Sequence, residues 1–177
     1  NDYQTRFERE SLYGWVRVID NPSLNLRLLT ADASTIGAAS ISHGKNVLTY
    51  QKIVEMIPSF APNMKQALLI GQGAGHMVST LERHGISTDT VEIDPAIDEA
   101  ARDHFDFIPT GRTLIGDARS EIRKLKGPYD LIILDVMMPE MDGYEVCRRL
   151  RRNPLTARAP IMMLTAQDTL EEKIKGF

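Results

Sequence analysis

The sequence predicts an α/β fold in three layers, in which a parallel sheet carries helices on both faces and follows a small antiparallel β meander. From residue 65 onward, short apolar stretches alternate with stretches of helical spacing, the pattern of strand–helix–strand units. Before residue 45, segments of alternating apolar and polar residues are separated by turn residues, which indicates antiparallel strands. Several of the later strands end in glycine or a carboxylate, as expected where a parallel sheet presents a site at its carboxyl edge.

Composition and charge describe an ordinary globular chain of one domain with a small appendage. Of its 177 residues, 42% are hydrophobic and 25% are charged, which suffices for a core of its own. The net charge of −3 gives no general attraction to nucleic acid. No apolar run reaches the roughly 20 residues of a membrane span, and the first residues lack the apolar core of a signal peptide. We therefore expect a cytoplasmic protein with neither a nucleic-acid nor a membrane partner.

Cysteine and histidine offer no metal site. The single cysteine, Cys147, excludes an internal disulfide and a zinc site built from cysteines. It falls among the apolar positions of a helical pattern, so we expect it to pack in a core. The four histidines are scattered over turns and helices without a carboxylate or second histidine at ligand spacing. No metal is therefore expected.

The first 60 residues form the N-terminal unit. Strands are expected at 11–20, 24–30 and 35–41, and a helix at 50–57 that stops at Pro58. A meander of this size is marginal in water, so it must pack on the rest of the chain or pair with a second copy. The Ala-Pro-Asn sequence at 61–63 marks the boundary to the next unit.

Beyond this boundary, five strands alternate with five helices. The expected strands lie at 66–70, 88–93, 112–115, 129–134 and 160–164. The expected helices lie at 76–84, 95–105, 118–126, 144–152 and 169–175. Alternation at this spacing implies right-handed crossovers, and therefore a parallel sheet with helices on both faces.

Three strand ends carry residues suited to a nucleoside. Gly71, Gly73 and Gly75 follow the first parallel strand, where glycines let the backbone turn tightly and approach a ligand at a helix N-terminus. Glu92 ends the next strand about twenty residues later, where a carboxylate can accept both ribose hydroxyls. Asp117 follows the third strand and can accept from an adenine amino group. The alternative interpretation is that these are turn glycines and strand-capping acids without a ligand.

A further carboxylate, Asp135, ends the apolar run at 131–134. A buried parallel strand that stops at an acid delivers that acid to the carboxyl edge of the sheet. Asp135 is therefore the candidate catalytic residue of the chain.

A family resemblance covers roughly the first 135 residues, chiefly from residue 11. It is carried by the motifs GQGAG, VEID, GDARSEI and YDLIILD, together with the upstream hairpins, HGK and the 50–57 helix. This part resembles the spermidine-synthase (aminopropyltransferase) family within the class I S-adenosylmethionine-dependent transferase fold. The resemblance implies S-adenosylmethionine, or its decarboxylated form, as the ligand. It places the three glycines beside the methionine-derived tail and Glu92 on the ribose, with Ile93 flanking the adenine. It also implies that Asp117 and Ala118 bind the base, and that Asp135 acts as general base on an amine.

The chain departs from this family at three positions. Ala74 stands where the family's glycine loop has an aspartate, Gln51 replaces the histidine of its Tyr-His pair, and Met138 replaces the second aspartate of the loop after Asp135. Polyamines are cations, so two lost carboxylates remove the charge pairing that would bind and orient an amine. The residues therefore predict ligand binding without efficient aminopropyl transfer.

Residues 129–177 resemble a different family. The loop VMMPEMDG after Asp135, followed by GYEVCRRLRRNPLTARAPIMMLTA, is similar to a response-regulator receiver domain, which has a flavodoxin-like fold. The resemblance implies that Asp135 is the phosphoacceptor and that Thr165 supplies a hydroxyl. Receivers also need an acidic pair for a divalent cation, whereas the strand expected beside Asp135 ends in Gly71-Gln72-Gly73.

Together the two resemblances predict a hybrid with one continuous Rossmann-like sheet of strand order 3-2-1-4-5. In both families the strand that ends in the functional aspartate lies beside the first strand, so one half can continue into the other, and ligand is expected above Gly71 and Asp135. The predicted units are 1–60, an adenosyl-ligand-binding half at 61–135 and a receiver-like half at 136–177. We expect a recombined or engineered scaffold that retains an adenosyl ligand without efficient catalysis. The alternative is a natural transferase-like protein whose loop resembles that of a receiver by chance.

Two other functions stay open at the level of sequence. The first is an active aminopropyl- or methyltransferase that uses Asp135 as base, and the second is a phosphoreceiver of a two-component system. For the oligomeric state, the N-terminal hairpins and the open edge of the sheet both invite a homodimer.

Overall fold

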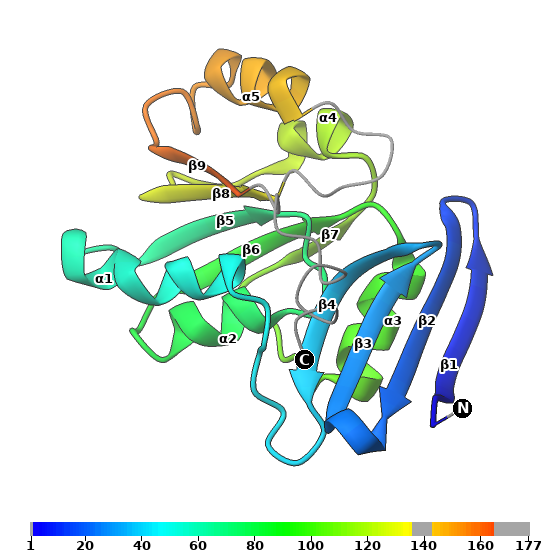
Figure 1. Cartoon of the computed structure of the whole chain (residues 1–177). Helices are drawn as coiled ribbons and strands as arrows, with labels where there is room; N and C mark the ends of the chain where they lie inside the picture. Colours follow the sequence, from blue (N-terminus) through cyan, green and yellow to red (C-terminus); the bar gives the residue numbers. More distant parts are fainter. Residues whose placement is uncertain (1, 136–142, 165–177) are drawn as a thin grey trace.

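The computed structural model describes residues 2–135 and 143–164, and Figure 1 shows how their elements are arranged. The chain forms a four-stranded antiparallel meander and a five-stranded sheet of order β7-β6-β5-β8-β9 in which every pairing is parallel. Numbered within the parallel sheet alone, this order is 3-2-1-4-5. The predicted three-layer α/β fold and its strand order are therefore confirmed.

The meander has four strands rather than the three expected. They are β1 (Gln4–Ser11), β2 (Gly14–Asn21), β3 (Leu26–Ala31) and β4 (Ser34–Ser40), with the short 3-10 helix η1 (Pro22–Leu24) between β2 and β3. Strand β1 was not expected, because half of its residues, QTRFERES, are charged and most are exposed on both faces. An edge strand of this kind lacks the apolar alternation by which strands are recognised, and its charges discourage pairing with another chain.

The meander packs on helix α3 (Pro95–His104) of the main body, as Figure 1 shows. Val16, Val18 and Leu29 of the meander share a buried cluster with Ile97 and Ala100 of α3. Packing on the body was one of the two alternatives for so small a sheet, and it is the one observed. Pairing with a second copy stays a prediction.

A buried carboxylate holds the meander together. The side chain of Asp20 in β2 is 1% exposed and accepts from Arg6 of β1 at 2.8 Å and from Arg27 of β3 at 2.7 and 2.9 Å. Arg27 also donates to the carbonyl of His104 at the end of α3. The hydrogen bond from Arg27 is the main cause of the lowered pKa of Asp20. One buried charge therefore ties three strands to the body.

Helices cover both faces of the parallel sheet, which comprises β5 (Gln66–Ile70), β6 (Ser87–Glu92), β7 (Thr113–Ile115), β8 (Leu131–Asp135) and β9 (Ile161–Leu164). Successive side chains of a strand point to opposite faces. Leu69 and Ile133 accordingly pack with helices η2 (Tyr50–Met56), α1 (Ile57–Phe60) and α2 (His76–Glu82). Leu68 and Ile132 pack on the other face, with α4 (Ala118–Glu121), η3 (Ile122–Lys124) and α5 (Gly143–Arg152).

The receiver-like α5 completes this second layer. Val146 and Leu150 are fully buried and belong to the same cluster as Leu68 of β5 and Ala118 of α4. Cys147, expected in a core, is only half-buried beside them. The buried cluster on this face therefore continues from the strands and helices before Asp135 into α5.

Two helical predictions need correction. Pro58 does not stop the helix at 50–57, because it sits in the first turn of α1, where a missing N–H costs nothing. The helix expected at 118–126 is split into α4 and η3. The helix expected at 169–175 lies outside the described residues. No helix in the described part of the chain is long and apolar enough to cross a membrane.

We predict that Asp20→Asn lowers the free energy of unfolding by about 2 to 3 kcal/mol, because it leaves Arg27 without its charged acceptor in a partly buried place. Glu8→Gln is the matched control, since Glu8 pairs with Arg17 on the exposed side of the same meander, and it should change stability by less than about 0.5 kcal/mol. Urea unfolding followed by the fluorescence of Trp15 measures both. Equal effects of the two substitutions would contradict the importance given to Asp20.

Candidate functional site

The carboxyl ends of the parallel strands bring the predicted site residues to one edge of the sheet. Ile70 at the end of β5 pairs with Val91 of β6 on one side and with Leu134 of β8 on the other. Glu92 pairs with Ile115 at the end of β7. The residues that follow these strand ends therefore share this edge, which is the location expected for a ligand in an open α/β sheet.

The glycine loop between β5 and α2 has the backbone that its sequence predicts. Gly71, Gly73 and Gly75 have φ values of 85°, 55° and 80°, a region that other residues rarely adopt. A β-carbon at Gly75 would lie 2.2 Å from the ring of Phe107, so the last glycine is also needed for packing. Gly75 is the N-cap of α2, whose N-terminus begins at the loop.

Gln72 fixes the centre of this loop, a role that the sequence does not indicate. Its side chain is buried, donates to Asp98 at 3.0 Å and accepts from the hydroxyl of Thr90 at 3.1 Å. Both polar atoms of the amide are thus satisfied within the protein. These hydrogen bonds hold the loop in place, so its shape does not depend on a ligand.

Glu92 lies beneath the glycine loop and is almost fully buried, with 4% of its surface exposed. One carboxyl oxygen accepts from the backbone amides of Gln72 at 3.0 Å and Gly73 at 3.4 Å, and the other accepts from the amide of Asp94 at 3.1 Å. Burial raises the pKa of Glu92 to about 7, although these three amide hydrogen bonds oppose the rise, and the charge of Asp94 adds to it. The strand-end acid is therefore a titratable support of the loop.

Asp94 connects this site to the meander. Asp94 is 1% exposed and is the N-cap of α3, where one of its carboxyl oxygens accepts from the backbone amide of Ala96. Its other oxygen accepts from the hydroxyl of Ser11 in β1 at 2.6 Å. The motif VEID thus supplies one acid to the glycine loop and a second to a helix cap. Ile93 between them is partly buried and packs against the cluster formed with α4 and α5.

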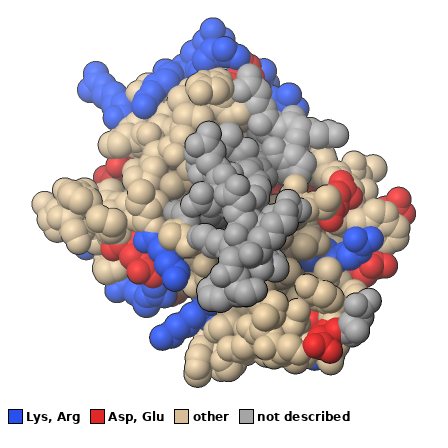
Figure 2. Space-filling model, in the orientation of Figure 1, with Lys and Arg blue, Asp and Glu red and all other residues tan. Residues whose placement is uncertain are grey.

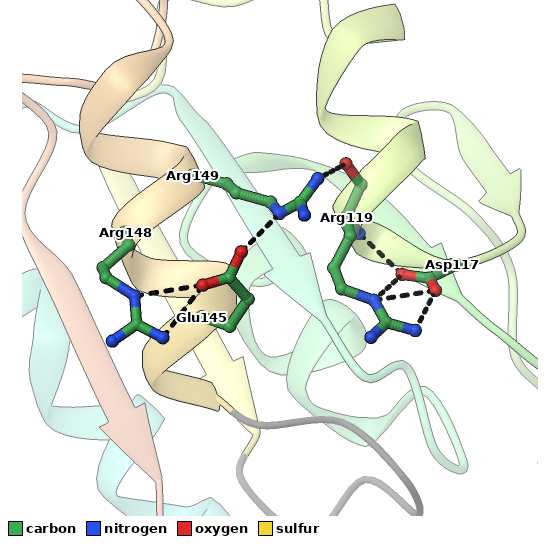
Figure 3. Close-up of polar contacts among 5 residues, drawn as sticks. All are labelled: Asp117, Arg119, Glu145, Arg148 and Arg149. Atoms are coloured by element: carbon green, nitrogen blue, oxygen red, sulfur yellow. Dashed lines mark hydrogen bonds and ion pairs between the residues drawn. The ribbon is translucent and has the colours of Figure 1, made fainter.

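Asp117 and Ala118, the predicted adenine-binding residues, begin α4. Asp117 is the N-cap of α4 and accepts from the backbone amide of Arg119 at 2.8 Å. Figure 3 shows that the guanidinium of Arg119 folds back onto the same carboxylate, and this pairing is the main cause of the lowered pKa of Asp117. Ala118 is fully buried, so only its backbone could meet a base. An adenine amino group would have to compete with Arg119 for Asp117.

Helix α5 reaches the same corner, as Figure 3 also shows. Arg149 donates two hydrogen bonds, one to Glu145 at 2.8 Å and one to the carbonyl of Arg119 at 3.2 Å. Arg148 donates to the other oxygen of Glu145 at 3.0 Å. The receiver-like helix is thereby connected to the turn of α4 that carries Asp117 and Arg119.

Asp135 ends β8 and pairs with Leu164 of β9. It is 6% exposed. Met138 and Thr165, to which the two resemblances gave roles, lie outside the described residues. Within residues 2–135 and 143–164, no group of three or more His, Cys, Asp and Glu side chains is placed to hold a metal ion.

A cavity of about 710 Å³ lies at the opposite edge of the sheet, away from these residues. It is lined by the segments that precede β5, β8 and β9, at 60–64, 128–130 and 154–160. Because catalytic groups of parallel sheets collect at the carboxyl edge, this cavity is not the candidate site.

We predict that Glu92→Gln flattens the pH dependence of stability between pH 4.5 and 7. In this window the folded protein holds a proton that an unfolded glutamate has already lost, so the free energy of unfolding of the unsubstituted chain falls as pH rises. The raised pKa of Glu92 corresponds to a fall in the free energy of unfolding on the order of 3 kcal/mol from pH 4.5 to 7, which the Glu92→Gln variant should not show. Urea unfolding at several pH values measures it.

Glu82→Gln is the matched control, because Glu82 is an exposed carboxyl at the end of α2. This control should keep the pH dependence of the unsubstituted chain. Parallel pH profiles for all three proteins would show that Glu92 does not titrate near neutral pH.

The C-terminal part of the chain matches a known sequence family. The model of the response regulator receiver domain matches residues 113–177, so the match begins at β7, earlier than the expected residue 129. The chain is 37% identical over 95 residues to the DNA-binding dual master transcriptional regulator RpaA of Synechocystis sp., covering 49% of this chain and 36% of that protein. It is 45% identical over 65 residues to the phosphate regulon transcriptional regulatory protein PhoB of Rhizobium meliloti, covering 37% and 29%. The chain spans about a third of the length of these relatives.

Solved structures with a similar fold come from different proteins. A probable spermidine synthase from Corynebacterium glutamicum has a TM-score of 0.63 at 16% identity, covering 81% of this chain and 59% of its own. The SAH-bound methyltransferase PaMTH1 of Podospora anserina has a TM-score of 0.54 at 17% identity, covering 70% and 55%. At these identities the likeness shows the fold alone. The chain therefore combines a receiver sequence in its C-terminal part with the fold of S-adenosylmethionine-dependent methyltransferases and spermidine synthase.

Proposed function

We propose that this chain is a hybrid scaffold that binds an S-adenosylmethionine-type ligand at the carboxyl edge of the parallel sheet, without efficient transfer chemistry. The observation that carries the proposal is Glu92 beneath the glycine loop. Burying a carboxyl costs free energy, as its raised pKa indicates, and the backbone amides of the glycine loop hold this acid at the edge of the sheet where a ribose would lie. A ribose that donates its hydroxyls to this carboxylate would stabilise the charged form.

The residues present fit such a ligand in part. The glycine loop approaches the protein closely, since a β-carbon at Gly73 would lie 3.0 Å from the backbone oxygen of Ile36, and its left-handed backbone suits glycine alone. Glu92 offers the acid for the ribose. At the adenine end the fit is incomplete, since Asp117 is already paired with Arg119. The bound ligand would supply a sulfonium centre, and the residues of this chain would hold its ribose and base.

The packing around Ala74 is the reason to expect slow aminopropyl transfer. Its side chain is 2% exposed and packs in the meander cluster beside Gly37, at which a β-carbon would lie 2.6 Å from that of Ala74. The position that carries an aspartate in aminopropyltransferases is therefore committed to packing here. A cationic acceptor loses one of its charge partners, and orientation of the acceptor is a large part of the rate of such a reaction.

Two other functions have less support. A working aminopropyl- or methyltransferase would use Asp135 as base, and its buried position at the strand end suits that role. A phosphoreceiver is favoured by the family match to residues 113–177. Against it, the strand beside Asp135 leads into Gly71-Gln72-Gly73, so β5 gives no acidic pair to bind the cation that phosphotransfer needs.

The origin of the hybrid also belongs to this proposal. We infer a recombination of two families within the segment that runs from β7 to β8. The support is that a receiver sequence begins inside a sheet whose other strands follow the transferase order.

Calorimetric titration with S-adenosylmethionine, its decarboxylated form and methylthioadenosine tests the proposal. We predict micromolar binding of at least one ligand and at least a tenfold weaker affinity for Glu92→Ala, because charged hydrogen bonds to the ribose are lost. Glu82→Ala is the matched control and should bind normally. Circular dichroism shows whether Glu92→Ala is folded, and Glu92→Gln replaces it if it is not. No heat with any ligand would contradict adenosyl binding, while rapid turnover with an amine acceptor would contradict the absence of catalysis.

We further predict that Arg119→Ala raises the affinity for these ligands about two- to five-fold, because the adenine amino group no longer displaces a guanidinium from Asp117. Arg83→Ala is the control, since it breaks a surface pair with Glu55 in helix η2. Unchanged affinity for Arg119→Ala, with a normal response to Glu92→Ala, would place the base away from Asp117.

A further inference from the structure

Cations gather on the outer side of the layer formed by α4, η3 and α5. Figure 2 shows them at the top of the molecule, where Figure 1 places α4 and α5. We define the basic face as six residues of these helices: Arg119, Arg123, Lys124, Arg148, Arg149 and Arg152.

The basic face is one continuous and fixed surface. At one end, Arg149 donates to the carbonyl of Arg119 at 3.2 Å. At the other end, Asn153, just after α5, donates to the carbonyl of Ile122 at 2.9 Å, beside Arg123. Buried Val146 and Leu150 hold α5 on the sheet between these two contacts. The six cations are therefore presented on a rigid support.

The positive charge of this face is only partly neutralised. Three carboxylates lie among the six cations, since Asp117 pairs with Arg119, Glu121 with Lys124, and Glu145 with both Arg148 and Arg149. Arg123 and Arg152 are exposed and have no ion pair within the described part of the chain. A surplus of positive charge thus stands on a chain whose net charge is −3.

The chemistry of the face fits phosphate groups. Five of its six cations are arginines, whose planar guanidinium binds phosphate through two parallel hydrogen bonds. Tyr144, which is 70% exposed, precedes Arg148 by one helical turn and so lies on the same side of α5. Arginines beside an exposed aromatic ring are the combination that binds single-stranded nucleic acid, by phosphate pairing and base stacking.

We propose that the basic face is a docking surface for single-stranded nucleic acid. The cations stand on two helices in contact, α4 and α5, whereas the major groove of a duplex admits a single helix; a flexible strand can pass over both. Insertion into a membrane would need large apolar side chains on the outer side of α5, where the face instead presents arginines. The low net charge, which led us to expect no nucleic-acid partner, averages over this uneven distribution.

Fluorescence anisotropy with a labelled oligothymidylate of about 20 nucleotides tests the proposal, at 50 and 200 mM salt. The double variant Arg123→Glu/Arg152→Glu should bind at least tenfold more weakly, and the slope of log K against log salt should fall by about 1.4, from two lost phosphate contacts in a single strand. The matched control is Lys45→Glu/Lys52→Glu, which changes the net charge equally at exposed positions outside the basic face. It should reduce affinity by less than about threefold.

Three outcomes would overturn the proposal. These are no binding at 50 mM salt, equal losses for the two double variants, and tighter binding to a duplex of the same length than to the single strand. Vesicles of anionic phosphatidylserine serve as a further probe, and binding to vesicles but not to the oligonucleotide would assign the face to a lipid surface instead. Circular dichroism of both variants checks their folding, and the exposed positions make unfolding unexpected.

Discussion

The parallel pairing of β5 with β8 is the constraint on which the rest of the structure depends. It joins residues more than sixty positions apart, with Ala67 opposite Leu131 and Ile70 opposite Leu134. This register brings the glycine loop and Asp135 to the same edge. It also gives each face of the sheet one continuous apolar surface. On one of these faces, α4 and α5 pack in the same buried cluster. A shift of register would move the buried side chains to the wrong face and separate the two strand ends.

The candidate site at the carboxyl edge of the sheet contains features that destabilise the fold, and the packing of the core must offset them. Glu92 is buried with a raised pKa, and glycines with left-handed backbone are needed beside it. Such features are common where a protein must hold a ligand, because preorganisation of a site opposes the stability of the unliganded fold. Helix α5 forms part of the layer over this sheet, where buried Val146 and Leu150 supply apolar contacts.

The sequence predicted much of the fold, for identifiable reasons. The run at 131–134 is apolar throughout, which indicates a strand buried on both faces, and glycine or an acid marked the ends of three other strands. Strand β1 was missed because an exposed charged strand has no apolar pattern. The residues of the candidate site were also recognised in the sequence, but their contacts were not. That Glu92 accepts from the loop amides, and that Arg119 covers Asp117, depends on side-chain geometry that spacing along the chain does not encode.

The most direct test of one shared core is native-state hydrogen exchange of the β5 and β8 amides in the unsubstituted chain and in Leu150→Ala. This substitution removes buried apolar contacts of α5 and should cost about 2 to 5 kcal/mol. If the two halves open as one unit, protection of Leu69 in β5 and of Ile133 in β8 falls by the same factor. Loss of protection in β8 with none in β5 would show that the two halves fold separately, and would contradict this account.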